Sequence, residues 1–356
     1  MTMSTSTKKL NIVYLVSTPL RDISGGVRVI TYHIDGLLEL GHTVEMWVPK
    51  GYGLEPYFFT NTPIREVENL DATNLNKPDI VVLCDPSLLG IVARRRKKPG
   101  TFLLLQHDMQ YLYEVDETTH KVSPLQEHAD YLRTACRIIV VSDWIKDALQ
   151  ARLGLTSFVV RNGVDKALFH PDSEPLVRSK EPVALIFYDP QPWKGFNDVM
   201  QALVGVKGQV PELRIAIISQ GFPVAAEVGS SYSYTFPVIY FNRPDQRDMA
   251  KVFSSASVFI SASWQEGFGL PGLEAMACGV PLVTTDSGGV REYAIPNTTA
   301  LVTPPRDIPA LTEAVMEVLR DEKLRARLSH SGLEKAEQFS WPSSIKRLVI
   351  LFRQYA

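Results

Sequence analysis

The stretch SVFISASWQEGFGLPGLEAMACGVPLVTT, residues 257–285, holds a complete strand–helix–strand unit and decides the fold. Its apolar runs at 257–263 and 281–285 predict buried strands, and the segment between them predicts a helix that follows a Gly-Phe-Gly-Leu-Pro turn. Glu266 and Glu274 flank this turn, with seven residues between them. We expect Glu266 on the loop that leaves the first strand and Glu274 in the first turn of the helix.

The residues around this turn suit a ligand that carries both phosphate and hydroxyl groups. A helix N-terminus offers free backbone N–H groups and a partial positive charge, which favour a phosphate. Ionised carboxylates are strong acceptors for O–H donors, so Glu266 and Glu274 suit sugar hydroxyls. A nucleotide sugar combines these groups, and the sequence therefore predicts a nucleotide-sugar site.

Short apolar runs of the same kind recur along the chain, each followed by a helix-length segment. They lie at 10–16, 44–48, 79–84, 101–106, 137–141, 158–160, 183–188, 213–218, 238–241, 257–263, 281–285 and 300–302. Near-continuous apolar strands are typical of parallel sheets covered on both faces, and their alternation with helices predicts right-handed βαβ units. The predicted fold class is α/β with doubly wound sheets.

The length of the chain and one irregular segment predict two domains. At 356 residues the chain exceeds the size at which one hydrophobic core usually keeps growing. Residues 166–182 break the alternation with prolines and mixed charges, so we interpret them as a linker between Rossmann-like domains at 1–165 and 183–342. After Trp341–Pro342, a last amphipathic helix at 343–356 is expected to return to the first domain. Because ligands bind beyond the carboxyl ends of parallel strands, we expect the site in the cleft between the domains.

The composition argues against several classes of partner and location. A net charge of −2 gives no reason to expect nucleic acid. Cys84, Cys136 and Cys278 lie in apolar segments without metal-ligand spacing, as free thiols in a reducing compartment do. The first nine residues lack the apolar core of a secretion signal, and no apolar run approaches the roughly 20 residues of a membrane span. We expect a cytoplasmic protein.

The pentapeptide SGGVR occurs at 24–28 and again at 287–291, once in each half. Paired glycines let a backbone approach an anion closely, and a following helix adds its dipole. Two such turns that face each other across a cleft would hold a pyrophosphate and the sugar attached to it. The alternative is that each Gly-Gly pair only makes a tight turn.

These motifs together resemble the retaining glycosyltransferases of the GT-B fold, family 4, of the glycosyl transferases group 1 type. The resemblance rests on the spacing of Glu266 and Glu274 within EGFGLPGLEAMACGVPLV, on TDSGGVRE, on Lys194-Gly195 and on FSW at 339–341. In the first half it rests on SGGV at 24–27, ELGHTV, the histidine His107 after a strand, and RNGVDKALFHP. It covers nearly the whole chain.

The resemblance implies roles for the residues of the second half. Glu274 would bind the ribose hydroxyls of the nucleotide, and Glu266 would lie by the donor sugar near its anomeric centre. The backbone of Gly267, Phe268 and Gly269, together with Leu270, would contact the bound donor. The alternative for a glutamate on a helix is ordinary solvation, but Glu274 begins an otherwise apolar helix.

It also implies roles around the diphosphate. Lys194 would neutralise the leaving group, as an ammonium does well, and Gly25 and Gly26 would approach it from the first domain. His107 would lie near the donor sugar on the first-domain side. A surface role for Lys194 and a structural role for His107 are the alternatives.

The chain departs from the family pattern at one position. Family members usually carry Gly-Arg a few residues before the Lys-Gly, and here Asp189 stands in place of that arginine. A carboxylate cannot bind a diphosphate directly. Three accounts are open: another base compensates, with Arg28, Arg243 and Arg291 as candidates, the donor lies differently, or a metal bridges at Asp189.

The basic run Arg94–Lys98 has two interpretations. As the end of a helix before Pro99-Gly100, it would complement the helix dipole in solvent. In family members with lipid-linked acceptors, the same patch would touch anionic phospholipid at the inner face of the membrane.

The resulting hypothesis is a retaining hexosyltransferase, or deoxyhexosyltransferase, that needs no cofactor and no metal. It would move a sugar from a nucleoside diphosphate to a saccharide or lipid-linked acceptor, in surface polysaccharide or glycan biosynthesis. The resemblance also leaves room for a GT-B epimerase or phosphorylase, and for a nonenzymatic protein that binds sugars or nucleotides.

Overall fold

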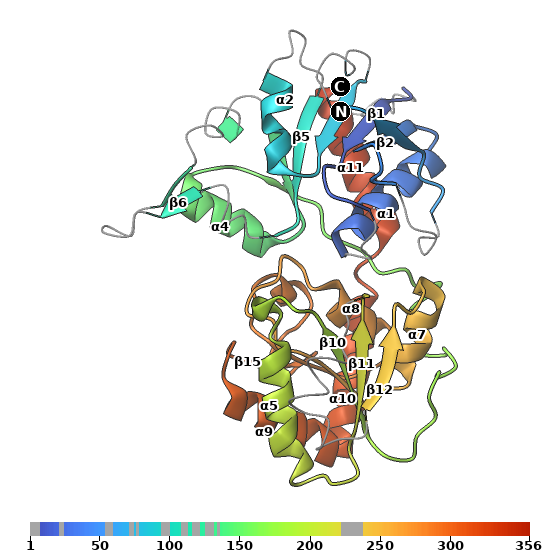
Figure 1. Cartoon of the computed structure of the whole chain (residues 1–356), viewed down its shortest axis with the longest axis vertical. Helices are drawn as coiled ribbons and strands as arrows, with labels where there is room; N and C mark the ends of the chain where they lie inside the picture. Colours follow the sequence, from blue (N-terminus) through green and yellow to red (C-terminus); the bar gives the residue numbers. More distant parts are fainter. Residues whose placement is uncertain are drawn as a thin grey trace, which may run out of the picture.

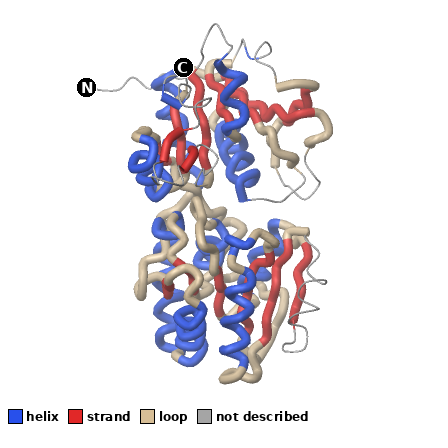
Figure 2. Tube along the Cα trace, turned by 60° about the vertical axis from the view of Figure 1, so that its left-hand side comes forward, coloured by secondary structure: helices blue, strands red, loops and turns tan. Residues whose placement is uncertain are grey.

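The computed structural model describes residues 8–20, 25–53, 60–70, 75, 78–93, 100–107, 113–115, 122–124, 132–133, 136–221 and 238–356. Their strands form two parallel sheets, one in each half of the chain, and helices cover both sheets (Figures 1 and 2). The N-terminal sheet ends with a strand at Val159, and the C-terminal sheet begins with a strand at Val183.

The N-terminal sheet has the strand order β3-β2-β1-β4-β5-β8-β9, and all its neighbouring strands are parallel. Its strands are β1 (Asn11–Leu15), β2 (Thr43–Pro49), β3 (Ile64–Val67), β4 (Ile80–Leu83), β5 (Gly100–Leu105), β8 (Arg137–Val140) and β9 (Phe158–Val159). The α-helices of this half are α1 (Gly25–Glu39), α2 (Leu89–Ala93) and α4 (Asp143–Leu153), with a 3-10 turn η2 (Pro86–Leu88). A separate antiparallel pair consists of β6 (Tyr113–Val115) and β7 (Val122–Pro124).

The C-terminal sheet has the order β12-β11-β10-β13-β14-β15 and is also parallel throughout. Its strands are β10 (Val183–Tyr188), β11 (Arg214–Ser219), β12 (Val238–Asn242), β13 (Val258–Ser261), β14 (Leu282–Thr285) and β15 (Leu301–Thr303). Its helices are α5 (Phe196–Lys207), α7 (Gln246–Ser254), α8 (Leu270–Ala277), α9 (Ile308–Arg320) and α10 (Glu322–Ala336), with 3-10 turns η5 (Pro192–Lys194) and η6 (Gly289–Glu292).

Every apolar run that the sequence analysis identified contains a strand of one of these two sheets. The cause is burial on both faces: in β10, for example, the consecutive residues Ala184, Leu185 and Ile186 point to alternate faces of the sheet and are all buried. β3 and the β6–β7 pair were not predicted from the sequence. β3 (IREV) is an edge strand with two exposed charged residues at its centre, so it carries no apolar run.

The last helix, α11 (Trp341–Tyr355), returns to the N-terminal half, as predicted. Figure 1 shows it beside α1 and β1. The two helices approach closely because Gly36 lacks a side chain: a Cβ there would lie 2.6 Å from Ile345. Ser340 caps the first turn of α11 and Pro342 lies within that turn, where a proline needs no N–H partner.

Candidate functional site

Lys194 and Glu266 lie side by side at the carboxyl ends of two neighbouring strands, β10 and β13. The Lys194 ammonium donates a hydrogen bond of 2.9 Å to Glu266 Oε1, which also accepts one of 2.8 Å from the Ser263 hydroxyl. Burial alone would lower the pKa of Lys194, but the charge and hydrogen bond of Glu266, together with Asp189, raise it above its ordinary value. Lys194 is therefore a cation at neutral pH.

The turn before Lys194 is built by Asp189. Its carboxylate accepts the backbone N–H of Gln191 at 2.9 Å, and the N–H of Lys194 donates to the carbonyl of Gln191 at 2.9 Å. Gly195 then adopts φ +70°, and a Cβ at this position would lie 2.0 Å from the carbonyl oxygen of Ala262. The residue that stands in place of the usual arginine thus shapes the turn that carries the lysine.

Glu274 was expected in the first turn of its helix, but it lies in the second turn of α8, because the helix already begins at Leu270. Gly269 precedes it with φ +80°, and the Tyr293 hydroxyl donates a 2.5 Å hydrogen bond to the Gly269 carbonyl. Side chains at Gly269 or Gly272 would collide with this hydroxyl. The helix start is therefore fixed by Tyr293, which the sequence analysis did not single out.

Arg28 of α1 forms an ion pair with Glu274 across the two halves of the molecule. Its Nη2 donates to Glu274 Oε1, and the side chains are only 12% and 2% exposed. The ion pair thus places one of the three candidate arginines beside the carboxylate that the resemblance assigns to ribose.

His107 follows β5 and keeps an exposed side chain. Partial loss of surrounding water lowers its pKa, Lys194 lowers it further, and Glu266 and Asp85 partly oppose this. These charges reach it because it faces the second half of the molecule. The structure therefore brings His107, Lys194 and Glu266 into one electrostatic neighbourhood, with a neutral imidazole at neutral pH.

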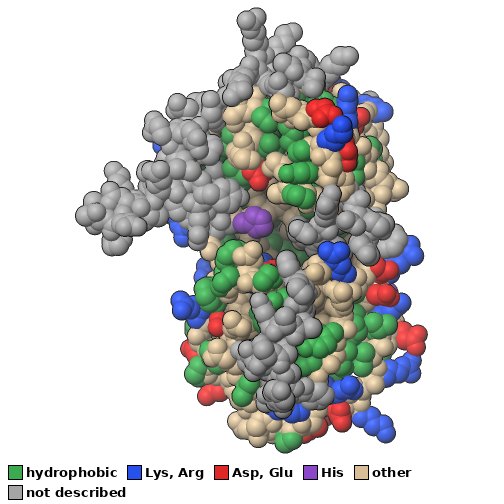
Figure 3. Space-filling view, in the orientation of Figure 1, with side chains coloured by type: hydrophobic (Ala, Val, Ile, Leu, Met, Phe, Trp, Pro, Cys, Tyr) green, Lys and Arg blue, Asp and Glu red, His purple; other side chains and the backbone are tan. Residues whose placement is uncertain are grey.

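The two halves touch at the predicted glycines. A Cβ on Gly267 would lie 1.8 Å from the carbonyl oxygen of Gln106, and one on Gly25 would lie 3.8 Å from Leu270. Gln106 also donates a 3.1 Å hydrogen bond to the carbonyl of Gly26. Figure 3 shows the surface hollowed between the two halves. The Phe268 side chain is buried against Tyr293 and Phe339, so only its backbone can face a ligand.

The two SGGVR copies lead into different elements. The first runs into the long helix α1, and its Ser24 lies outside the described residues. The second enters only the 3-10 turn η6. There Gly288 has φ +91° and lies against the Trp144 ring, while a Cβ on Gly289 would lie 2.2 Å from the Gly267 carbonyl oxygen. The second pair of glycines thus packs closely against Trp144 and Gly267.

The other two candidate arginines have different surroundings. Arg291 forms a bidentate pair with Asp286, at 2.6 and 2.8 Å, and this pairing lowers the pKa of the Asp286 carboxyl. Arg243 follows the edge strand β12 with φ +46° and lies against Gly221.

A second interdomain cluster holds α4 to η6. Glu292 accepts the Asp143 backbone N–H with Oε1 and the Arg161 Nε with Oε2, both at 2.5 Å. The Ser142 hydroxyl donates to the Gly267 carbonyl at 2.7 Å. The sequence analysis missed this cluster because its members are far apart in sequence and match no motif.

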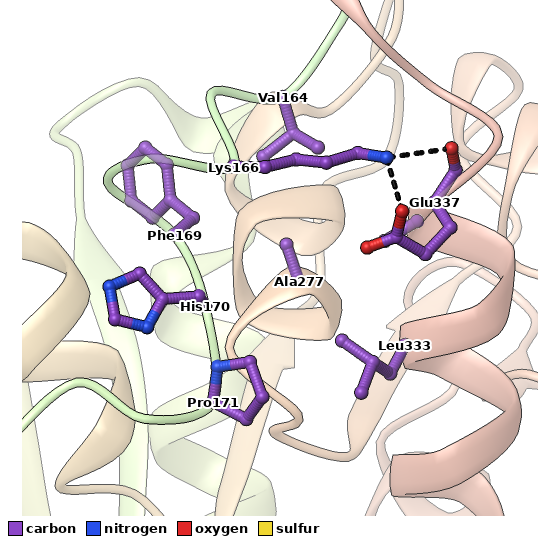
Figure 4. Close-up of a pocket in the computed structure, with 9 residues that line it drawn as sticks. Val164, Lys166, Phe169, His170, Pro171, Ala277, Leu333 and Glu337 are labelled. Carbon is purple, nitrogen blue, oxygen red and sulfur yellow. Dashed lines mark hydrogen bonds and ion pairs between the residues drawn. The ribbon is translucent and has the colours of Figure 1, made fainter.

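A pocket near the linker is of a different kind (Figure 4). It is lined by Phe169, His170 and Pro171 of the linker and by helical residues such as Leu333. Lys166 turns to Glu337, where it donates to both the carbonyl and the carboxylate. Its charge is already matched within the chain, so we assign this pocket to packing of the linker.

The remaining predictions concern the metal and the membrane. Within the described ranges, no three His, Cys, Asp or Glu side chains gather as metal ligands would. Across the same ranges, no helix combines the length and the apolar character that crossing a bilayer requires. The basic run Arg94–Lys98 lies outside the described residues.

Comparison with known families now adds to this geometry. Residues 171–335 match the family described as glycosyl transferases group 1, and residues 23–168 match the family described as Glycosyltransferase Family 4. The chain belongs to the family 4 glycosyltransferases of the GT-B fold. The fold predicted from the sequence, including the returning helix, is thereby confirmed.

Solved glycosyltransferase structures share this GT-B fold along nearly their full length. A sucrose-phosphate synthase of Thermosynechococcus elongatus has a TM-score of 0.80 at 19% identity, covering 97% of this chain and 98% of its own. Anabaena HepE in complex with UDP-glucose has a TM-score of 0.77 at 16% identity, covering 97% of this chain and 100% of its own.

Curated relatives are similar over shorter stretches. A D-inositol 3-phosphate glycosyltransferase of Nocardioides is 27% identical over 55% of this chain and 48% of its own length. A GDP-mannose-dependent phosphatidylinositol monomannoside mannosyltransferase of Mycolicibacterium smegmatis is 30% identical over 53% of this chain and 54% of its own. This glycosyltransferase thus spans about half the length of the curated relatives it matches.

Proposed function

We propose that this chain transfers a hexosyl unit from a nucleoside diphosphate sugar to a saccharide or lipid-linked acceptor, with retention of the anomeric configuration. The observation that carries the proposal is the meeting of Lys194, Glu266 and His107 beside the interdomain contact of Glu274. Each charge there suits one part of such a donor. Two relatives support this donor class by name, one crystallised with UDP-glucose and one dependent on GDP-mannose.

The donor would lie between the two halves. Glu274 would accept hydrogen bonds from the ribose hydroxyls, and the ammonium of Lys194 would neutralise the diphosphate. The Glu266 carboxylate is oriented by Lys194 and Ser263, which aims it at the sugar. The neutral imidazole of His107 would contact that sugar from the N-terminal half.

The transfer step follows from these positions. The bond between the anomeric carbon and the diphosphate oxygen breaks, and its electron pair stays on the diphosphate. The acceptor hydroxyl forms its bond on the same face and gives its proton to a diphosphate oxygen. Because Lys194 is held as a cation by Glu266, the developing negative charge meets a preorganised partner. We propose that the protein groups supply this charge without a metal or other cofactor.

The acceptor would approach from the N-terminal half. The aromatic-rich segments 52–60 and 106–117 are candidates, although most of their residues lie outside the described ranges. One relative over a short stretch, 34% identical over 31% of this chain, is an O-antigen chain mannosyltransferase of Escherichia coli. We therefore propose surface polysaccharide or glycan assembly at the cytoplasmic side of a membrane.

Titration with nucleoside diphosphates tests the donor assignment. UDP, GDP, ADP and dTDP are titrated by calorimetry into the wild type, and the one that binds is then titrated into Glu274→Gln. We expect the variant to bind about tenfold more weakly or worse, since a charge-assisted hydrogen bond to ribose is lost. Glu334→Gln, on the exposed face of α10, is the matched control and should bind like the wild type. Equal affinity in Glu274→Gln would remove the ribose assignment.

A turnover assay separates an enzyme from a binding protein. Sugar donors of the nucleotide that binds are incubated with a panel of saccharide acceptors, and release of nucleoside diphosphate is measured. Product anomers are then assigned by NMR. An inverted product would contradict retention, and tight nucleotide binding with no release under any acceptor would favour a binding role.

A further inference from the structure

The ion pair between Arg28 and Glu274 leaves a buried donor on one side chain and a buried acceptor on the other without a partner among the described residues. Nη2 of Arg28 contacts Oε1 of Glu274, but within the described residues neither Nε of Arg28 nor Oε2 of Glu274 has a hydrogen-bond partner, and both atoms are buried. Burying an unpartnered donor and an unpartnered acceptor costs stability. Two such atoms in one ion pair, Arg28 Nε and Glu274 Oε2, indicate that these side chains bind a ligand.

The second interdomain cluster shows what a complete contact looks like. Both oxygens of Glu292 accept hydrogen bonds from the N-terminal half, one from the backbone of Asp143 and one from Arg161. Each oxygen of Glu292 therefore already has a partner within the chain. The two carboxylates therefore differ: both oxygens of Glu292 hold the two halves together, whereas only Oε1 of Glu274 has a partner among the described residues.

The position of Arg28 adds the second argument. It lies in the first turn of α1, two residues after Gly26, and the backbone of Gly25 and Gly26 faces the start of α8 and Gln106. A nucleotide that enters between these helix ends would meet both side chains of the pair. The Glu274 carboxylate could then accept hydrogen bonds either from the Arg28 guanidinium or from the ribose hydroxyls.

We infer that Arg28 has two positions: it pairs with Glu274 in the nucleotide-free protein and moves to the diphosphate when a nucleotide binds. This inference rests on the proposed function, because it assigns Glu274 to ribose. A diphosphate offers the planar guanidinium two parallel hydrogen bonds in place of the single contact with Glu274. Arg28 thereby takes over the diphosphate contact that Asp189 cannot make.

Two ligands distinguish the two positions of Arg28. A nucleoside carries the ribose without phosphates. Its ribose must displace Arg28 from Glu274, but it has no phosphate oxygen to accept hydrogen bonds from the Arg28 guanidinium. A nucleoside diphosphate displaces it as well but gives it a new partner. Removing the guanidinium should therefore help the nucleoside and harm the diphosphate, a crossed effect that a purely structural role would not produce.

The experiment measures both affinities in Arg28→Met. The probes are the nucleoside diphosphate that binds the wild type and its parent nucleoside, titrated by calorimetry or ligand-observed NMR. We expect tighter nucleoside binding and a ratio of diphosphate to nucleoside affinity that falls by about tenfold or more, because the charge-assisted hydrogen bonds of the guanidinium to the diphosphate are lost. Arg327→Met, whose guanidinium donates to the Asn297 carbonyl on the exposed side of α10, should leave both affinities unchanged.

A second variant, Arg28→Lys, keeps the test possible if Arg28→Met does not fold. Arg28→Lys keeps the charge but not the planar fork, and thermal unfolding checks that each variant is native. We expect its affinity ratio to lie between those of the wild type and Arg28→Met. Unchanged ratios in both variants, with a wild type that binds the diphosphate, would overturn the inference alone. A wild type that binds no nucleoside diphosphate would instead overturn the proposed function.

Discussion

His33 is a buried residue of α1 that the site does not use. It lies between Tyr14 and Trp341, with ring centroids 6.5 and 6.1 Å away, and neither ring nitrogen is hydrogen-bonded within the described residues. Burial lowers the pKa of His33 to about 3. The folded protein therefore holds this imidazole neutral at pH values where the unfolded chain, with an ordinary pKa near 6.5, already binds a proton.

The sign of the pH effect follows. Between pH 6.5 and about 3 the unfolded state binds more protons at this residue, so its contribution to stability is full above pH 6.5 and is lost as the pH falls. We expect His33→Leu to remove a slope of up to about 1.4 kcal/mol per pH unit from the free energy of unfolding. Urea denaturation at pH 7.0, 6.0 and 5.0 measures it. An unchanged slope in His33→Leu would contradict the prediction.

The limit of sequence reasoning is clearest at single residues of the site. Lys194, Glu266 and Glu274 could be named because each follows an apolar run at a motif spacing, where parallel strands converge. The partner of Glu274 could not be paired with it from sequence, because Arg28 is 246 positions away and only the approach of two domains brings them together. Ser142 and Tyr293 were missed for a different reason: their hydroxyls donate to backbone carbonyls, and such contacts leave no pattern in a sequence.

At the scale of elements, two segments cross where α11 begins. Val164, which lies just before the linker, donates its N–H to the Phe339 carbonyl. The preceding Gly163 packs against the backbone at the start of α11. A Cβ on Gly163 would lie 2.2 Å from the backbone nitrogen of Trp341. Backbone atoms cannot turn aside as a side chain can, so this crossing tolerates only glycine.

We expect Gly163→Ala to lower the free energy of unfolding by about 1–3 kcal/mol through overpacking. Gly90→Ala is the matched control, since a Cβ there meets nothing within 4 Å and α2 gains helix propensity, worth about 0.5–1 kcal/mol. Urea denaturation of the two variants should thus show shifts of opposite sign. A Gly163→Ala variant as stable as the wild type would show that the crossing can relax.

Elements were predictable from sequence where burial was complete. Each strand that is covered on both faces appears as an apolar run, whereas β3 places Arg65 and Glu66 in solvent and gives no such signal. The length of the element after the second SGGVR was not predictable, because close packing of Gly288 on Trp144 and of Gly289 on Gly267 decides it. Those contacts belong to the tertiary fold.

At the scale of the whole molecule, α11 makes the N-terminal core depend on the C-terminal end of the described chain. Phe352 is fully buried, with its ring 5.0 Å from that of Phe102 in strand β5, the neighbour of the central strand β4. The Tyr355 ring also lies against Phe102 and Phe158. One face of the sheet is therefore closed by a helix that follows the other domain in sequence.

We expect Phe352→Ala to cost about 3–5 kcal/mol of stability in the N-terminal half, because it empties a site within a rigid core. Ile350→Ala on the same helix should stay within about 0.5 kcal/mol, since that side chain is 62% exposed. Urea denaturation that resolves the two domains measures both. Similar losses in the two variants would mean that α11 contributes through its helix and not through packing on β5.

The return of α11 to the N-terminal half also determines the order in which the two halves complete their folding during translation. The strands of the N-terminal sheet have all been translated by Val159, yet the helix that covers their apolar face begins only at Trp341. Until then the ribosome carries a sheet with an open hydrophobic face, a surface that invites chaperones and aggregation. The C-terminal sheet and α10 are translated before that helix, so the half made first is the half completed last.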